Sequence, residues 1–169
     1  MTVQTQVDDL HIGWRWFDLS RVSVTVIQQL VMRMKRLDMR GCRLTDHQEV
    51  VMFNSIRQSP QLVSLKLHAV YPQLSGLFNY LMETDKPTLK HLTIYSSQLE
   101  WYDPATVANS LSKLESVNMI GWVPPAMLTM LAEKIQSGSR NLKELRLDCD
   151  VSEEVKKIFQ ESLKFIQEF

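Results

Sequence analysis

The apolar residues of this chain repeat a six-residue pattern along most of its length. Five copies carry apolar side chains at their first, fourth and sixth positions: residues 34–39, 62–67, 89–94, 114–119 and 142–147. A weaker sixth copy covers residues 14–19. The fourth positions are successively 20, 28, 27, 25 and 28 residues apart. Because the fourth and sixth residues are two apart, they share one face of a strand, so each copy predicts a short strand with one buried face.

Between the copies the spacing of apolar residues becomes that of an amphipathic helix. Residues 74–82 place apolar side chains at i, i+3, i+4, i+7 and i+8. Asp46 and Glu49 have the spacing of a capping box, and Gly138 suits a helix C-terminus. Further helix starts are predicted where a capping residue or a proline precedes an apolar stripe: Asp103–Pro104, Pro124–Pro125 and Ser152. The last of these helices has a stripe that runs from Val155 to Ile166.

Units of strand, turn and helix at this period are typical of leucine-rich repeats. A single unit cannot bury its apolar face alone, whereas stacked units build one parallel sheet and one continuous core. We therefore predict an α/β fold, a curved leucine-rich-repeat solenoid of about five to six repeats with short parallel strands on its concave face and helices on its convex face. Residues 1–12 are expected to form an N-terminal tail or cap, 13–151 the repeats, and 152–169 a C-terminal capping helix.

Composition and charge narrow the class of partner. The 169 residues include 19 basic and 19 acidic side chains, which gives no general attraction to nucleic acid or to an anionic membrane. No apolar run reaches the length of a membrane helix, and the first residues lack the features of a secretory signal. The two cysteines are more than a hundred residues apart, which is no disulfide framework. We expect an intracellular protein, cytoplasmic or nuclear, with protein partners and neither nucleic acid nor membrane.

The chain lacks the usual motifs of a catalytic or metal site. His68 and His91 lie on neighbouring predicted strands but four residues out of step, roughly 13 Å along the strand and too far apart to share a metal ion. Cys42 and Cys149 have no histidine or basic residue at a diagnostic spacing. We therefore predict a protein that is not an enzyme, with no catalytic residues, no metal and no cofactor.

Two stretches near the N-terminal end resemble a particular class of repeat protein. Residues 14–20 read WRWFDLS and residues 37–46 read LDMRGCRLTD. The second is similar to the cysteine-containing repeat of F-box leucine-rich-repeat proteins, with Cys42 at the ninth position of the repeat, and the first resembles a phrase that follows the F-box in those proteins. Only one copy carries the cysteine, and no F-box is visible in the dozen residues before Trp14. The resemblance implies a substrate-recognition module of a ubiquitin ligase, with ligase components as further partners.

Positions three, five and seven of each copy point away from the predicted core and form three rows across the sheet. The third row is Trp16, Arg36, Ser64, His91, Ser116 and Glu144; the fifth is Asp18, Asp38, Lys66, Thr93, Asn118 and Arg146; the seventh is Ser20, Arg40, His68, Tyr95, Ile120 and Asp148. Neighbours within a row are one strand apart, roughly 4.8 Å. Candidate partner-binding residues on this concave face are Trp16, Arg36, Arg40, Lys66, His68, His91, Tyr95, Asn118, Ile120, Trp122 and Arg146.

These candidates also have plainer interpretations. Ile120 and Trp122 either anchor a partner, as exposed aromatic and aliphatic side chains do, or cover the turn of the next repeat. Asp38 and Lys66 are cross-strand neighbours, which favours a salt bridge on the sheet. The basic residues around Arg36 and Arg40 suit a solvated face or a contact with phosphate or an acidic peptide.

Three functions remain open at this point. The first is substrate recognition or an adaptor role for a ubiquitin ligase. The second is a structural or scaffold subunit of a multiprotein assembly without a link to ubiquitin. The third is the ligand-sensing repeat array of an immune receptor. The sequence specifies neither the partner nor the oligomeric state.

Overall fold

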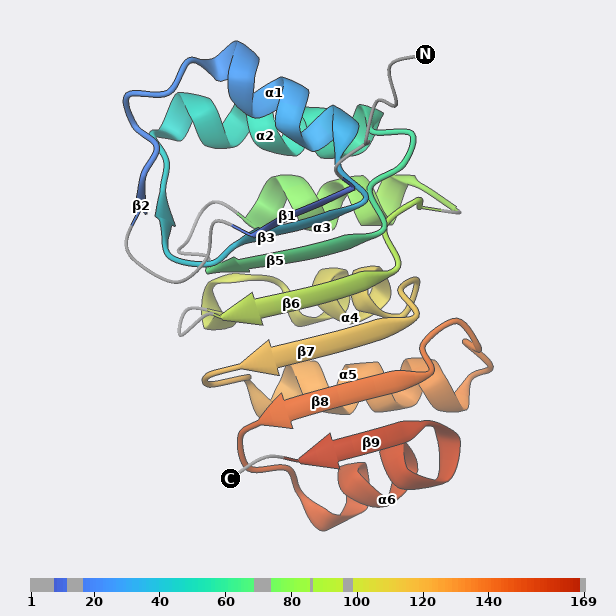
Figure 1. The fold of residues 1–169 in the computed structure, drawn as a ribbon. Coiled ribbons are helices and arrows are strands. Elements are labelled where there is room, and N and C mark those ends of the chain that lie inside the picture. Colours follow the sequence, from blue (N-terminus) through green and yellow to red (C-terminus); the bar gives the residue numbers. More distant parts are fainter. Residues whose placement is uncertain (1–7, 12–16, 69–73, 86, 96–98, 168–169) are drawn as a thin grey trace.

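The computed structural model describes residues 8–11, 17–68, 74–85, 87–95 and 99–167. The strands in these residues are β1 (Asp9–His11), β2 (Phe17–Asp18), β3 (Arg36–Met39), β4 (Cys42–Arg43), β5 (Ser64–His68), β6 (His91–Tyr95), β7 (Ser116–Ile120), β8 (Glu144–Asp148) and β9 (Lys164–Gln167). The helices are α1 (Val24–Arg33), α2 (Asp46–Gln58), α3 (Leu74–Glu83), α4 (Pro104–Leu111), α5 (Pro125–Gln136) and α6 (Glu153–Ser162), with a short 3-10 helix at Leu99–Trp101. Figure 1 shows strands and helices alternating along most of the chain.

Seven of the strands form one parallel sheet in the order β1-β3-β5-β6-β7-β8-β9. Apart from the two short strands β2 and β4, this order follows the chain, so each strand is laid beside the one before it. The register aligns the fourth residues of the five main copies in one row, Leu37, Leu65, Leu92, Val117 and Leu145. Each of these side chains is at most 2% exposed. The predicted α/β class and the five predicted strands are confirmed.

The helices from α3 to α6 lie on one side of this sheet (Figure 1). Consecutive helices also contact one another along the whole series. The predicted stripe on α3 is buried at Leu74, Leu77, Phe78 and Leu81, while Met82 is 39% exposed. Burial on the helices and on alternate strand residues joins into one core cluster, as stacked units require, because each unit shares its apolar face with its neighbours.

Side-chain caps fix where several helices begin. Asp103 accepts a hydrogen bond from the Thr106 amide at 2.8 Å, and Pro104 follows as the first helical residue, as predicted. The expected pairing of Asp46 with Glu49 is wrong. The capping box consists of Thr45 and Gln48, since the Thr45 amide donates to the Gln48 side chain at 2.8 Å and the Thr45 hydroxyl accepts from the Gln48 amide.

The first strand of the sheet lies earlier in the chain than predicted. β1 occupies a segment expected to be a tail or cap, and Leu10 aligns with Leu37. The residues 14–19 copy was expected to supply this strand, but its described part forms β2, which pairs only with β4 in a separate two-stranded ladder. The ladder is held in place by Gln48, whose side-chain amide donates to the carbonyls of Leu19 and Val22 at 2.8 and 2.6 Å.

The predicted last helix is also shorter than expected. α6 starts after the Ser152 cap, as predicted, but it ends at Ser162. The chain then turns into β9, where Phe165 aligns with Leu145 and packs on Phe159 at 5.4 Å between ring centroids. The end of the expected helical stripe is wrong, because Leu163 follows the helix and Ile166 lies in the strand. An added strand covers apolar surface at the end of the sheet that a helix alone would leave exposed.

Candidate partner-binding face

The side of the sheet opposite α3–α6 carries the predicted rows of outward residues, and we call it the open face. It is defined by residues three, five and seven of the copies in β3, β5, β6, β7 and β8. The register confirms the rows across these strands, except at Arg40, which follows the end of β3 and is not among the aligned residues. Arg36, Ser64, His91, Ser116 and Glu144 align, as do Asp38, Lys66, Thr93, Asn118 and Arg146, and His68, Tyr95, Ile120 and Asp148. Trp16 lies outside the described residues.

The centre of the open face is formed by β5, β6 and β7. Its nine outward residues are all accessible: His68 and His91 are exposed, and the others are half-buried. Those others are Ser64, Lys66, Thr93, Tyr95, Ser116, Asn118 and Ile120. Hydroxyl, amide and imidazole groups thus surround one lysine, with an aromatic and an aliphatic side chain along one border. This mixture of adaptable polar groups and anchors is typical of a protein-binding surface.

A polar network spans three strands at the border of the open face. The Asp38 carboxylate is 2% exposed and accepts from the Arg40 guanidinium at 2.6, 2.8 and 3.0 Å. Arg40 also donates to the Tyr95 hydroxyl at 2.8 Å, and its guanidinium carbon lies 5.3 Å from the Tyr95 ring centroid. Arg40 therefore reaches past β5 and orients Tyr95 through a charge-assisted hydrogen bond and a cation–π contact.

The predicted salt bridge between Asp38 and Lys66 is replaced by this network. The two residues are Cα partners in the register, as expected. Asp38, however, forms an ion pair with Arg40 at 2.6 Å, and no described residue forms an ion pair with Lys66. A guanidinium can bind both carboxylate oxygens at once, which a single ammonium cannot match. The predicted basic cluster is partly neutralised in the same way, because Arg36 pairs with Asp9 at 2.7 Å.

Ion pairs also lie on β8, the last strand of the open face, and beside the starts of β6, β7 and β8. Arg146 contacts Glu144 at 2.8 Å, and Lys164 of β9 contacts the same carboxylate at 3.4 Å. Beside the strand starts, Glu115 lies between Lys90 and Lys143 at 2.8 and 3.0 Å. Hydrogen bonds from these two lysines lower the pKa of Glu115 to about 2. The carboxylates of Glu144 and Glu115 are thus already engaged within the chain.

Two tryptophans extend from the loops that follow β6 and β7. Trp122 is 51% exposed and follows Gly121, whose φ of 109° is open to glycine. Trp101 is 64% exposed at the end of the 3-10 helix. The packing interpretation of Trp122 therefore accounts for only half of its surface. Trp101 was not predicted as a site residue, because it lies outside the six-residue copies.

His68 and His91 lie on neighbouring strands with the offset that the sequence predicts. His91 aligns with Ser64 rather than with His68, so the two imidazoles lie at opposite ends of their strands. Cys42 and Cys149 are free thiols. Burial, with a contribution from Asp38, raises the pKa of Cys42 to about 11, and burial also raises the pKa of Cys149. Both thiols are therefore protonated at neutral pH, which makes them weak nucleophiles.

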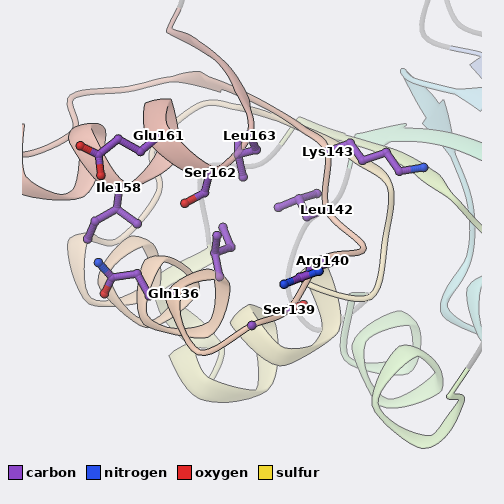
Figure 2. Close-up of a pocket in the computed structure, with 11 residues that line it drawn as sticks. Gln136, Ser139, Arg140, Leu142, Lys143, Ile158, Glu161, Ser162 and Leu163 are labelled. Carbon is purple, nitrogen blue, oxygen red and sulfur yellow. The ribbon is translucent and has the colours of Figure 1, made fainter.

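A cavity of about 750 Å³ lies away from the open face, between the C-terminal ends of α5 and α6 and the loop before β8 (Figure 2). Its apolar lining is Ile135, Leu142, Ile158 and Leu163, with polar side chains of Gln136, Arg140, Glu161 and Ser162 around them. The size is that of small-molecule sites. Lys143 lines it too, but its ammonium group is held by Glu115 outside. This cavity was not predicted: the helical spacing indicates a helix through Ile166, whereas α6 ends at Ser162, one of the residues that line the cavity.

Comparisons with known proteins give no family. No family model matches the chain, and no curated protein matches its sequence. Within the described residues, no helix is long and apolar enough to cross a membrane. The same residues contain no group of three or more histidine, cysteine or acidic side chains arranged to hold a metal ion.

Proposed function

We propose that this chain is a leucine-rich-repeat solenoid that works as a non-enzymatic protein–protein interaction module through its open face. The register of the strands supports the repeat, since equivalent residues of successive copies align across the sheet. The observation that carries the function is the centre of the open face. Nine side chains of β5, β6 and β7 are accessible there, although these are the middle strands of the sheet.

Side chains that are accessible on the middle strands of a sheet indicate a face that no other part of the described chain covers and that a partner can bind. Strand residues on a covered face are buried, as the row from Leu37 to Leu145 shows. The open face instead combines Tyr95, fixed by Arg40, with the half-buried Ile120 and with polar groups on three strands. A rigid platform with a fixed aromatic side chain lowers the entropy lost when a partner binds.

The finer proposal is substrate recognition or an adaptor role for a ubiquitin ligase. It rests on the similarity of residues 14–20 and 37–46 to F-box leucine-rich-repeat proteins. In the structure, Cys42 of the second stretch pairs with Phe17 of the first in the small ladder, so the two similar stretches meet in space. A scaffold role or an immune-receptor array would use the same face with different partners.

Affinity capture from cell lysate tests both the protein-interaction function of the open face and the finer proposal of a ubiquitin-ligase role. The wild-type chain is compared with a Thr93→Arg/Ile120→Asp double variant, and captured proteins are quantified by mass spectrometry. Met130→Asp is the control for the introduced carboxylate, because Met130 is 40% exposed on α5 and the substitution places on the helix side the same group that Ile120→Asp places on the open face. Circular dichroism checks that all three chains are folded.

The proposal predicts partners that are lost at least tenfold from the double variant and retained by Met130→Asp. Ubiquitin-ligase subunits or ubiquitylated proteins among those partners would support the finer proposal, and their absence from the lost set would favour a scaffold role. Partners that respond to Met130→Asp and not to the double variant would contradict the open face as the binding surface.

A further inference from the structure

The centre of the open face contains no acidic residue. The strands Ser64–His68, His91–Tyr95 and Ser116–Ile120 read SLKLH, HLTIY and SVNMI. Their outward residues include Lys66, two histidines, three aliphatic hydroxyl residues and Asn118. In a chain with equal numbers of acidic and basic side chains, an acid-free patch over three adjacent strands is a local departure that matters for binding.

Three of the carboxylates that border this patch are paired inside the chain, while a fourth, Asp148 of β8, aligns with Ile120 and is exposed. Asp38, on the neighbouring strand β3, is covered by Arg40, and Glu144 on β8 is shared by Arg146 and Lys164. Glu115, beside the start of β7, is held by Lys90 and Lys143. Lys66 lies in the middle row with a half-buried side chain and forms no ion pair with a described residue. The patch therefore presents a cation that no described residue pairs, among hydroxyl, amide and imidazole groups.

We propose that the open face over β5, β6 and β7 binds an extended acidic segment of a protein partner, with a carboxylate on Lys66 and an apolar side chain against Tyr95 and Ile120. This inference rests on the proposed function and names the chemistry of its ligand. Thr93 and Asn118 follow Lys66 along the same row, so their side chains offer hydrogen bonds to the peptide beyond the carboxylate. Complementary charge then sets the preference among peptides more than it sets the affinity.

The geometry favours a carboxylate over a phosphoryl group. Phosphopeptide sites usually bring several arginines onto one dianion. No arginine lies in the three central strands. In or next to the flanking strands β3 and β8, Arg36 is paired with Asp9, Arg40 with Asp38 and Arg146 with Glu144. A single ammonium flanked by neutral groups matches one carboxylate at a time, as an Asp- or Glu-containing segment supplies.

Selection from a random twelve-residue peptide library displayed on phage tests this inference. The immobilised full chain is panned, the selected consensus peptide is synthesised with a fluorescent label, and its dissociation constant is measured by anisotropy. Lys66→Gln and Lys66→Glu probe the cation. Lys134→Glu is the control, because Lys134 is an exposed lysine on α5 and its substitution changes the net charge by the same amount as Lys66→Glu.

We expect selected peptides enriched in Asp or Glu next to an apolar residue. Lys66→Gln should weaken the consensus peptide about threefold and Lys66→Glu about tenfold or more, with less than a twofold change for Lys134→Glu. Peptides that lose binding to the Thr93→Arg/Ile120→Asp variant but show no enrichment in Asp or Glu would overturn this inference and leave the proposed function standing. Peptides that lose binding to that variant but bind Lys66→Glu as tightly as the wild type would have the same meaning.

Two further results would also be decisive. Panning that yields no peptide sensitive to any open-face variant would overturn this inference, and the proposed function would then stand or fall with lysate capture. A consensus peptide whose phosphoserine version binds more than tenfold tighter than its glutamate version would reassign the patch to phosphorylated segments and contradict the carboxylate.

Discussion

Leu92 and Thr93 are adjacent in β6 but face opposite sides of the sheet, so they test the repeat with one pair of substitutions. Leu92 is 2% exposed and aligns with Leu65 and Val117, both fully buried. Thr93 is half-buried on the open face. Replacing each by alanine removes a side chain of moderate size from neighbouring positions of the same strand. We predict very different losses of stability for the two variants.

The expected magnitudes follow from burial. Truncation of a fully buried leucine to alanine costs about 2–5 kcal/mol, through lost transfer free energy and the cavity left behind. Because Leu92 lies between two buried neighbours in the middle of the sheet, little collapse is available, and we expect about 3 kcal/mol within that range. For a chain of 169 residues, this lowers the melting temperature by about 6–12 °C. Thr93→Ala should change the free energy of unfolding by about 0.5 kcal/mol or less.

Urea unfolding followed by far-ultraviolet circular dichroism measures both variants against the wild type. The slope of the transition is compared first, since repeat arrays can lose cooperativity and an altered slope would make the midpoints incomparable. With equal slopes, a loss below about 1 kcal/mol for Leu92→Ala would refute the buried row, because it lies under the range for a buried leucine. A loss for Thr93→Ala as large as that for Leu92→Ala would refute the assignment of faces.

Three more predictions concern single side chains. Thr45→Ala should lower stability by about 1 kcal/mol, because it removes the cap of α2; thermal unfolding checks this, and an unchanged melting temperature would argue against the capping box. Burial, together with Asp46, raises the pKa of Glu49 to about 7, so its proton stabilises the fold at low pH and this contribution is lost as pH rises from about 4.5 through 7. Glu49→Gln should therefore be more stable than the wild type at pH 8 and equal to it at pH 4, by urea titration at both values; equal stability at both would contradict the shift. In a Cys149→Ala background, Cys42 should react with iodoacetamide at pH 8 about 100-fold more slowly when folded than in denaturant, because its pKa is about 11; similar rates would show an accessible thiolate.

The central strands were predictable because their pattern is local. In LTI, three consecutive residues of β6, the alternation of Leu92, Thr93 and Ile94 specifies strand, face and spacing at once. The period then assigns each strand its neighbours, so the rows of the open face follow from the amino-acid sequence alone. That reasoning needs only that equivalent residues stack in register.

The two ends of the sheet were predicted less well. At the N-terminal end two candidate copies compete, and at the C-terminal end β9 matches the six-residue pattern only in part. Residues 7–12 read VDDLHI, which fits the pattern with Leu10 at its fourth position, yet the aromatic phrase at residues 14–19 gives the stronger signal for a first copy. β9 has Gln167 where the other strands carry an apolar sixth residue, and helical spacing through Ile166 favours a longer helix. Tertiary pairing decided both cases.

The main error on the open face comes from considering only adjacent strands. The prediction pairs Asp38 with Lys66 because they are neighbours, but Arg40 is long enough to bind Asp38 and still reach Tyr95 two strands away. A contact that a long side chain makes across two strands leaves no periodic pattern in the sequence, so the spacing of residues does not predict it. It bears on the proposed binding surface, because Arg40 orients Tyr95 and Lys66 forms no ion pair with a described residue.

Hydroxyl-radical footprinting of the chain with a captured partner tests the central claim most directly. Side-chain oxidation is measured with and without the partner at His68, Tyr95 and Trp122 on or beside the open face, and at Met82 and Met130 on the helices. We predict protection of the first group and unchanged oxidation of the two methionines. Protection of Met82 and Met130 with unchanged oxidation of His68 and Tyr95 would place the partner on the helices and contradict the open face as the binding surface.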